Sequence, residues 1–107
     1  MSEVQSWKWH NNDLKPIPWH FYKTCEQYPH NIAQLFNPEK YNEHNGQFKW
    51  YELRDRVEII ASGFISLGVK PKSLVAIMAE NSPRWTQVDL ALCCMGAVSV
   101  TILPSLS

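Results

Sequence analysis

Four histidines are the residues of this sequence best suited to metal coordination. His10, His20, His30 and His44 lie ten or more positions apart. Zinc sites draw their ligands from closely spaced pairs of His or Cys residues, so this spacing predicts no metal site. We interpret the four side chains as surface or capping residues.

Covalent catalysis would need an activated Cys or Ser nucleophile. Cys25, Cys93 and Cys94 form an odd set without a CxxC motif, and the adjacent pair falls inside a predicted helix, where neighbouring side chains point in different directions. No serine stands in a GxSxG nucleophile elbow. The sequence therefore predicts three reduced, mostly buried thiols and no covalent catalyst.

The loop Glu80-Asn81-Ser82-Pro83 stands where open α/β sheets bind ligands, between a predicted strand and a predicted helix. Helix N-termini attract phosphate because their free N–H groups point outward. This loop contains no glycine, and Pro83 removes one of the N–H donors that a phosphate would use. We therefore interpret Ser82 as a helix cap rather than as part of a phosphate site.

Three acidic residues, Glu52, Asp55 and Glu58, share a predicted helix with Arg54 and Arg56. Mixed charges on one helix are typical of a solvated face and need no catalytic explanation. From these patterns together, we expect no catalytic, cofactor-binding or metal-binding residue in this sequence.

A βαβ unit over residues 74–102 is the main predicted element. Leu74–Met78 is an uninterrupted apolar run, which is typical of a parallel strand covered on both faces. Ser82 begins a helix, Gly96 ends it, and Val98–Ile102 forms a second strand. A crossover of this length joins parallel strands and is expected to be right-handed. The apolar stripe expected to lie on the sheet consists of Trp85, Val88, Leu92 and Met95.

The chain before this unit adds an arm, a short helix, a hairpin and a long helix. Residues 1–18 are polar and aromatic, and Lys15–Pro18 fixes an extended path. Helical periodicity is strongest over Tyr51–Leu67. Glycine destabilises a helix interior, so the presence of Gly63 in this helix indicates that another backbone approaches it closely. The other predicted elements are a helix over Trp19–Tyr28, and a hairpin made of a strand over Ile32–Phe36 and extended structure over Phe48–Trp50.

The aromatic residues of the arm leave more than one interpretation. Trp7, Trp9 and Trp19 could pack the arm onto the body, anchor the chain at a lipid interface, or stack on nucleic-acid bases. Little charge accompanies them, so we favour packing, with the lipid interface as the alternative.

Charge and hydropathy restrict the partners. Ten basic and ten acidic residues give a formal net charge of zero, which disfavours nucleic acid as a partner. No apolar run approaches the roughly 18 residues that span a bilayer. We expect a cytoplasmic protein, with peripheral contact with a membrane left open.

A βαβ unit is a piece of a layered sheet and seldom a finished domain. The second strand, Val98–Ile102, comes near the end of the 107 residues, and no later strand is predicted to pair with its free edge. The hydrophobic fraction of 45% is ordinary for a globular protein. We therefore predict the N-terminal portion of an α/β domain, with residues 1–18 as an extended arm and residues 19–107 as a partial α/β subdomain.

Four stretches of the sequence carry motifs that point to one family. They are Lys49-Trp50-Tyr51-Glu52-Leu53, Leu67-Gly68-Val69-Lys70-Pro71, Glu80-Asn81-Ser82-Pro83-Arg84-Trp85, and the stretch from Met95 to Ser107. They resemble the T-Y-x-E-L segment, the L-G-V-x-P-G-D turn and the G-A-V-S-V-P-I-Y-P-T-L-S stretch of adenylate-forming, AMP-binding enzymes, and in particular the long-chain fatty-acid CoA ligases. The departures from these motifs are Lys49, Lys72, Ser73, Thr101, Leu103 and Ser105.

The resemblance implies the N-terminal portion of the large layered domain of such an enzyme. These enzymes use ATP and Mg²⁺ to convert a fatty acid to an acyl-adenylate, which coenzyme A then attacks. In the family the phosphate-binding loop and every other catalytic motif come after the point where this sequence ends. The resemblance therefore implies an inactive fragment that binds no cofactor itself, with fatty acid, ATP, CoA and the remainder of its own enzyme chain as partners.

Two alternatives stay open. One is a short interaction or regulatory protein that has kept this part of a synthetase fold and pairs its sheet edge with another chain. The other is a fragment of a different adenylate-forming ligase, acting on a medium-chain or aryl acid, because the acyl pocket does not fall in this segment.

Overall fold

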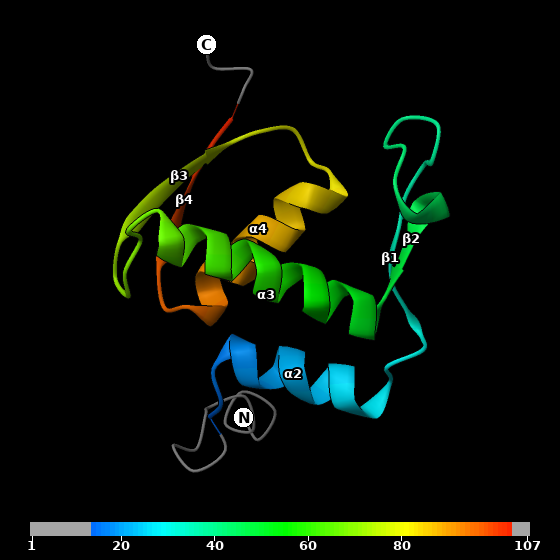
Figure 1. Cartoon of the computed structure of the whole chain (residues 1–107), viewed down its shortest axis with the longest axis horizontal. Helices are drawn as coiled ribbons and strands as arrows, with labels where there is room; N and C mark the ends of the chain where they lie inside the picture. The colour runs from blue at the N-terminus through cyan, green and yellow to red at the C-terminus, as the bar shows by residue number, and fades with distance from the viewer. Residues whose placement is uncertain (1–13, 104–107) are drawn as a thin grey trace, which may run out of the picture.

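The structure of this protein is a computed structural model, and it describes residues 14–103. The predictions made for most of the arm, including Trp7, Trp9 and His10, and for the last four residues lie outside this range. The chain folds into helices and strands in the following order (Figure 1): α2 (Ile17–Gln27), β1 (Ile32–Leu35), the short 3₁₀ helix η1 (His44–Gly46), β2 (Gln47–Lys49), α3 (Trp50–Ser66), β3 (Leu74–Met78), α4 (Pro83–Cys94) and β4 (Val98–Ile102).

The predicted βαβ unit is confirmed. Strands β3 and β4 pair in parallel, in a register that runs from Leu74 opposite Val98 to Met78 opposite Ile102, and α4 forms the crossover between them (Figure 1). Ser82 caps α4, because its Oγ accepts a hydrogen bond from the backbone N–H of Trp85 at 3.1 Å.

The predicted hairpin and long helix are confirmed as well. Strands β1 and β2 pair antiparallel, with an irregularity in the register between Ile32 and Gln34. Helix α3 follows β2 without a connecting loop, and its start is fixed by backbone hydrogen bonds from Trp50 N–H to Asn31 O and from Tyr51 N–H to Pro29 O. The hairpin therefore stands at one end of the long helix (Figure 1).

Helix α2 begins earlier than its sequence predicts. Ile17 is its first residue and Pro18 its second. Proline fits the first turn of a helix because its missing N–H would have no partner there. The extended path predicted for Lys15–Pro18 is therefore wrong in its second half, while the helix predicted over Trp19–Tyr28 is confirmed.

Helix α4 lies between two small cores. The first core contains Phe21, Cys25, Phe48, Leu53, Val57 and Ala91. The second core contains Ile77, Leu92 and Ala97, with the predicted stripe residues Trp85, Val88 and Met95 packed against it. Because Ala91 and Leu92 are neighbours on α4, this helix joins the α2–α3 layer to the sheet.

The residues that the structure describes cover only one face of β3, and the second cover that its apolar sequence predicts does not come from residues 14–103. Ile77 is 8% exposed and faces α4, whereas Leu74 and Met78 on the other face are 74% and 62% exposed. Side chains alternate along a strand, so α4 covers only one face of the pair. We call the other face the outer sheet face, and it consists of Leu74, Ala76, Met78, Val98, Val100 and Ile102.

The close approach expected at Gly63 is also wrong. Among residues 14–103, a Cβ added at Gly63 would meet no atom within 4 Å, so these residues leave the helix surface open there. A glycine that the fold does need is Gly46, which has φ +86° and whose Cβ would come within 2.7 Å of Phe36 O.

Candidate functional site

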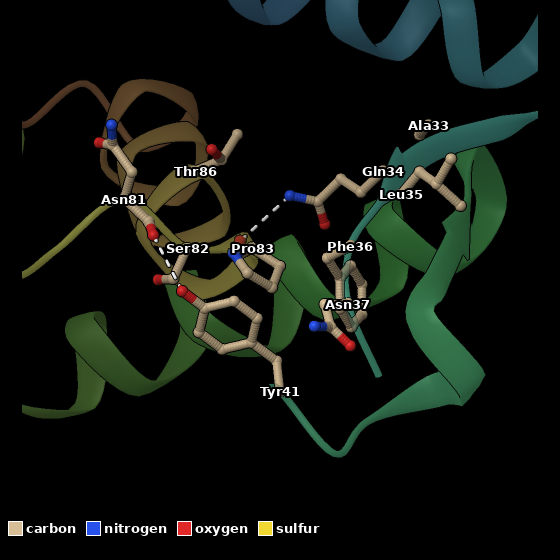
Figure 2. A pocket seen from close by; sticks show the side chains of 10 residues that line it. All are labelled: Ala33, Gln34, Leu35, Phe36, Asn37, Tyr41, Asn81, Ser82, Pro83 and Thr86. Atoms are coloured by element: carbon tan, nitrogen blue, oxygen red, sulfur yellow. Dashed lines mark hydrogen bonds between the residues drawn. The ribbon is translucent and has the colours of Figure 1, made fainter. Parts of the chain in front are cut away.

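An open groove of about 580 Å³ lies between β1, the loop that follows it, and the start of α4. Figure 2 shows the side chains of Gln34, Phe36 and Tyr41 on one side and the segment Asn81–Pro83 on the other. The lining residues are Ala33, Gln34, Leu35, Phe36, Asn37, Tyr41, Asn81, Ser82, Pro83 and Thr86. None of them carries a formal charge or a thiol, so the groove offers amides, hydroxyls and rings but no carboxylate, amine, imidazole or thiolate.

Two hydrogen bonds tie the two sides of the groove together (Figure 2). The Gln34 Nε2 donates to Pro83 O at 3.1 Å, and the Tyr41 hydroxyl donates to Asn81 O at 3.1 Å. Both acceptors are backbone carbonyls of the loop that the sequence placed before α4. These bonds fix the start of α4 against the hairpin.

A buried amide supports this arrangement from behind. The Gln87 side chain is fully buried on α4, and its Nε2 donates to Gln34 Oε1 at 3.0 Å. Within residues 14–103, no group donates to Gln87 Oε1. Sequence reasoning missed this residue, although a lone glutamine between apolar positions of a packed helix was the available signal.

The cap interpretation of Ser82 is confirmed, because its hydroxyl oxygen is occupied by the Trp85 N–H. Pro83 at the first helical position has no N–H to offer. A phosphate at the start of α4 would therefore compete with an existing cap and would find one donor fewer than at an ordinary helix N-terminus.

Glu43 links the loop after β1 to two helices. Its carboxylate, 15% exposed, binds the guanidinium of Arg56 on α3 and lies 3.5 Å from Arg84 Nε on α4. Burial alone would raise the pKa of Glu43, but the hydrogen bond and charge of Arg56, followed by those of Arg84, outweigh it and hold this pKa below its usual value. The Arg56 guanidinium also lies 5.1 Å from the ring centroid of Phe48.

The solvated, charge-mixed face predicted for α3 is therefore only partly correct. Arg56 is ion-paired, and Glu52 accepts a hydrogen bond from the backbone N–H of Lys49 at 2.9 Å, which stabilises the start of α3. Glu58 accepts a hydrogen bond from the Tyr22 hydroxyl at 3.1 Å. Burial, and after it this bond, raise the pKa of Tyr22 to about 12.

The three cysteines are free thiols, and Cys25 is fully buried. Burial raises the pKa of all three, in the case of Cys94 to about 11. At neutral pH they are protonated and poorly nucleophilic. The predicted burial is complete for Cys25, whereas Cys93 and Cys94 are partly exposed.

The described histidines lie beside aromatic rings. His44 stacks on Phe48 with ring centroids 4.2 Å apart, and His30 packs edge-on against Tyr51. The His44 Nε2 lies 3.6 Å from Glu52 Oε2. Across residues 14–103, no three His, Cys, Asp or Glu side chains are placed to hold a metal ion.

In the same part of the chain, every helix is too short or too polar to traverse a bilayer.

The fold and the matched sequence define the class. The structure superposes on the N-terminal subdomain of Klebsiella oxytoca NpsA in complex with 3-hydroxyanthranilyl-AMSN, with a TM-score of 0.76 and 25% sequence identity over 87% of this chain and 22% of that one. It is thus an α/β unit matching the N-terminal subdomain of adenylate-forming enzymes. Residues 21–107 match the family model of the AMP-binding enzymes, and the chain belongs to this family.

Named relatives differ in their substrates. The chain is 33% identical to the long-chain-fatty-acid–CoA ligase heimdall of Drosophila melanogaster over 90 residues, which are 83% of this chain and 13% of the relative. It is 31% identical to the Mycobacterium tuberculosis ligase named for 3-[(3aS,4S,7aS)-7a-methyl-1,5-dioxo-octahydro-1H-inden-4-yl]propanoyl:CoA, over 85% of this chain and 17% of the relative. The chain therefore spans less than a quarter of the length of each of these proteins.

Two departures from the family motifs have visible consequences. Lys72, where the family motif has glycine, adopts φ +72°, a left-handed conformation that disfavours side chains. Lys49 stands at the N-cap of α3 without a side-chain cap, so Glu52 supplies the remaining side-chain hydrogen bond at this end of the helix.

Proposed function

We propose that this chain forms the amino-terminal part of an ATP-dependent ligase that activates long-chain fatty acids. The fatty-acid carboxylate would attack ATP to give an acyl-adenylate and pyrophosphate, and the thiol of CoA would then displace AMP to give acyl-CoA. The observation that carries the proposal is the 33% identity to a long-chain-fatty-acid–CoA ligase over 83% of the chain. The motifs around Lys49–Leu53 and Glu80–Trp85 support the same class.

In this proposal residues 14–103 are scaffold rather than catalyst. The groove at the start of α4 is lined by amides, hydroxyls and apolar groups, and its two bridging hydrogen bonds end on backbone carbonyls. ATP, Mg²⁺, CoA and the fatty acid would be bound by the larger remaining part of the domain. Positioning and electrostatic stabilisation, which dominate such group transfers, would come from that part.

The outer sheet face gives this proposal a structural basis. Six apolar side chains lie on it, and within the described residues no helix covers them. Layered α/β sheets bury both faces, since burial of apolar surface is the main stabilising term in folding. We propose that the remainder of the AMP-binding domain packs against the outer sheet face.

The test is acid-dependent pyrophosphate release by the product of the complete reading frame that encodes these residues. Purified protein is incubated with ATP, Mg²⁺ and CoA, together with oleate, octanoate or 3-hydroxyanthranilate. The proposal predicts release with oleate well above release with the other two acids. Release with 3-hydroxyanthranilate alone would exclude the fatty-acid class, and no release with any acid would exclude the ligase.

An aryl-acid ligase is the second candidate, and one observation favours it. The NpsA subdomain that the structure matches at a TM-score of 0.76 was solved with 3-hydroxyanthranilyl-AMSN. The same substrate series separates the two candidates, because only the acid is changed.

A short interaction protein is the third candidate, favoured by the uncovered outer sheet face. It predicts a reading frame that stops after Ser107 and a stable stoichiometric complex in light scattering. A continuous downstream frame that encodes a phosphate-binding loop would exclude it.

A further inference from the structure

The start of α2 gathers exposed apolar and basic side chains. Ile17 is 64% exposed and Trp19 is 44% exposed, although the same helix buries Phe21 and Cys25 in the first core. We call this surface the α2 patch, and it consists of Leu14, Lys15, Ile17, Trp19 and Lys23. Helix α2, which carries most of this patch, packs beside α3 and α4 at the edge of the helical layer (Figure 1).

Two ammonium groups flank the exposed indole of the α2 patch. The Lys15 Nζ lies 5.7 Å and the Lys23 Nζ 5.9 Å from the ring centroid of Trp19. An indole beside lysines matches the chemistry of the membrane interface, where the ring lies at the level of the headgroups and the lysines reach lipid phosphates.

Local charge also favours an anionic surface. Residues 14–25 contain two lysines and no acid, although the whole chain has a formal net charge of zero. Among the described residues, Glu26 follows Cys25 on α2, and the Glu58 carboxylate accepts the hydrogen bond of Tyr22; in the sequence, Asp13 directly precedes Leu14. The attraction would therefore be confined to the first turns of α2 and would orient the chain with this end toward the lipid.

We propose that the α2 patch is a peripheral binding site for an anionic lipid bilayer. Leu14, Ile17 and Trp19 supply the apolar contact, while Lys15 and Lys23 supply the selectivity for negative headgroups. The binding does not depend on acyl activation, so the two proposals stand or fail separately.

The outer sheet face is a second apolar surface of the described residues that could meet a membrane, and it makes a different prediction. Its six side chains are all apolar, with no lysine or arginine among them. Adsorption through that face would be insensitive to lipid charge and to salt. Dependence on lipid charge therefore separates the two surfaces.

The experiment is co-sedimentation of the 107-residue chain with lipid vesicles. Vesicles of phosphatidylcholine are compared with vesicles that contain about 30% phosphatidylserine, at low and at high salt. We expect binding to the anionic vesicles on the order of tenfold tighter than to the neutral ones, and a marked loss at high salt. Equal binding to both kinds of vesicle, or binding to neither, overturns the proposal.

Variants locate the binding surface. The double substitution Lys15→Ser and Lys23→Ser should weaken binding to anionic vesicles on the order of tenfold. The matched control, Lys70→Ser with Lys72→Ser, removes the same charge at the turn before β3 and should leave binding unchanged.

Two substitutions of apolar residues make the same comparison without changing the charge of the chain. Ile17→Ser should weaken binding, whereas Ile59→Ser, at a residue of similar exposure on α3, should not. Circular dichroism verifies that each variant is folded. If the α2 variants bind as the wild type does and Val100→Asp abolishes binding, the outer sheet face is the lipid contact and the proposal is wrong.

Discussion

The side-chain Nε2 of Gln87 donates to Gln34 Oε1 at 3.0 Å from a fully buried position on α4, and Gln34 in turn donates to Pro83 O. One chain of amides therefore joins the middle of α4 to the hairpin and back to the first residue of the same helix. The groove keeps its shape because these three residues are linked.

Replacement of Gln87 tests this chain. Gln87→Glu should destabilise the fold by about 3 kcal/mol at neutral pH, because an ionised carboxylate is buried and cannot donate to Gln34. Burial raises the folded-state pKa of such a carboxyl, so the loss should shrink as pH falls from that raised pKa to the unfolded-state value of about 4.3, and it should be smallest below that value, where the acid is protonated in both states. Urea denaturation at pH 7 and pH 4 measures the difference. Gln87→Leu is the control, and its smaller loss should not depend on pH.

Glu43 provides a second stability test, at a carboxyl whose folded-state pKa is lowered rather than raised. Glu43→Gln removes the charge that Arg56 and Arg84 share, and should cost about 1 kcal/mol at pH 7. Because the folded-state pKa of Glu43 is lowered, its contribution is present above the usual value of 4.5 and is lost as pH falls through the folded pKa. The difference from wild type, measured by urea denaturation, should therefore vanish in acid.

The two arginines provide an internal comparison for Glu43. The Arg84 side chain is 76% exposed and that of Arg56 is 27% exposed. Arg56→Ala should therefore cost more stability than Arg84→Ala, since solvent screens an exposed pair. Equal losses for the two variants would contradict this description of the cluster.

Tyr22 and Glu58 join α2 to α3, and this bond should be visible at alkaline pH. Burial, and then the hydrogen bond to Glu58, raise the pKa of Tyr22 from 10.0 to about 12. The fold favours protonated Tyr22, so its contribution is complete below pH 10 and is lost as pH rises toward 12. Tyr22→Phe should cost about 1 kcal/mol at pH 8, and the difference from wild type should disappear by pH 12. Absorbance titration at alkaline pH identifies the tyrosine with the raised pKa by its loss in the variant.

A charge placed on the outer sheet face should have different effects in the 107-residue chain and in the complete protein. Met78→Asp should change the stability of the 107-residue chain by less than about 0.5 kcal/mol, because the side chain is 62% exposed there. In the complete protein the same change should cost about 3 kcal/mol or more, because an unpaired charge would be buried beneath the rest of the domain. Thermal denaturation of both proteins measures this, with Ile59→Asp on α3 as the matched exposed control. Equal effects of Met78→Asp in both proteins would show that nothing covers the face.

Patterns of neighbouring residues predicted most of the helices and strands, but few of the tertiary contacts between them. The periodicity of α3 and the Ser82 cap of α4 depend on neighbouring residues, and the structure confirms both. Whether Leu74 and Met78 are covered depends on which layers of the domain are present. The apolar composition of a strand reflects its burial in the complete domain, so it does not tell which segments provide the cover.

The errors at single residues have a similar origin. A glycine such as Gly63 indicates close packing only weakly, because a helix tolerates it at a cost of about 1 kcal/mol. Gly46 is required by its backbone conformation and by the nearby Phe36 O, but its φ of +86° arises from the turn after Asn45, which no helical or strand periodicity reveals. Gln87 and the pairing of Glu43 with Arg56 depend on contacts between distant segments. Spacing along the sequence can mark Gln87 as unusual on its helix, but it does not identify the partners in such contacts.

The most direct test of the ligase proposal is pyrophosphate release by the product of the complete reading frame, measured beside the 107-residue chain. The account predicts that the complete protein releases pyrophosphate when oleate and ATP are both present, and that residues 1–107 alone release none. A complete product without acid-dependent release, or release by the 107-residue chain itself, would contradict it.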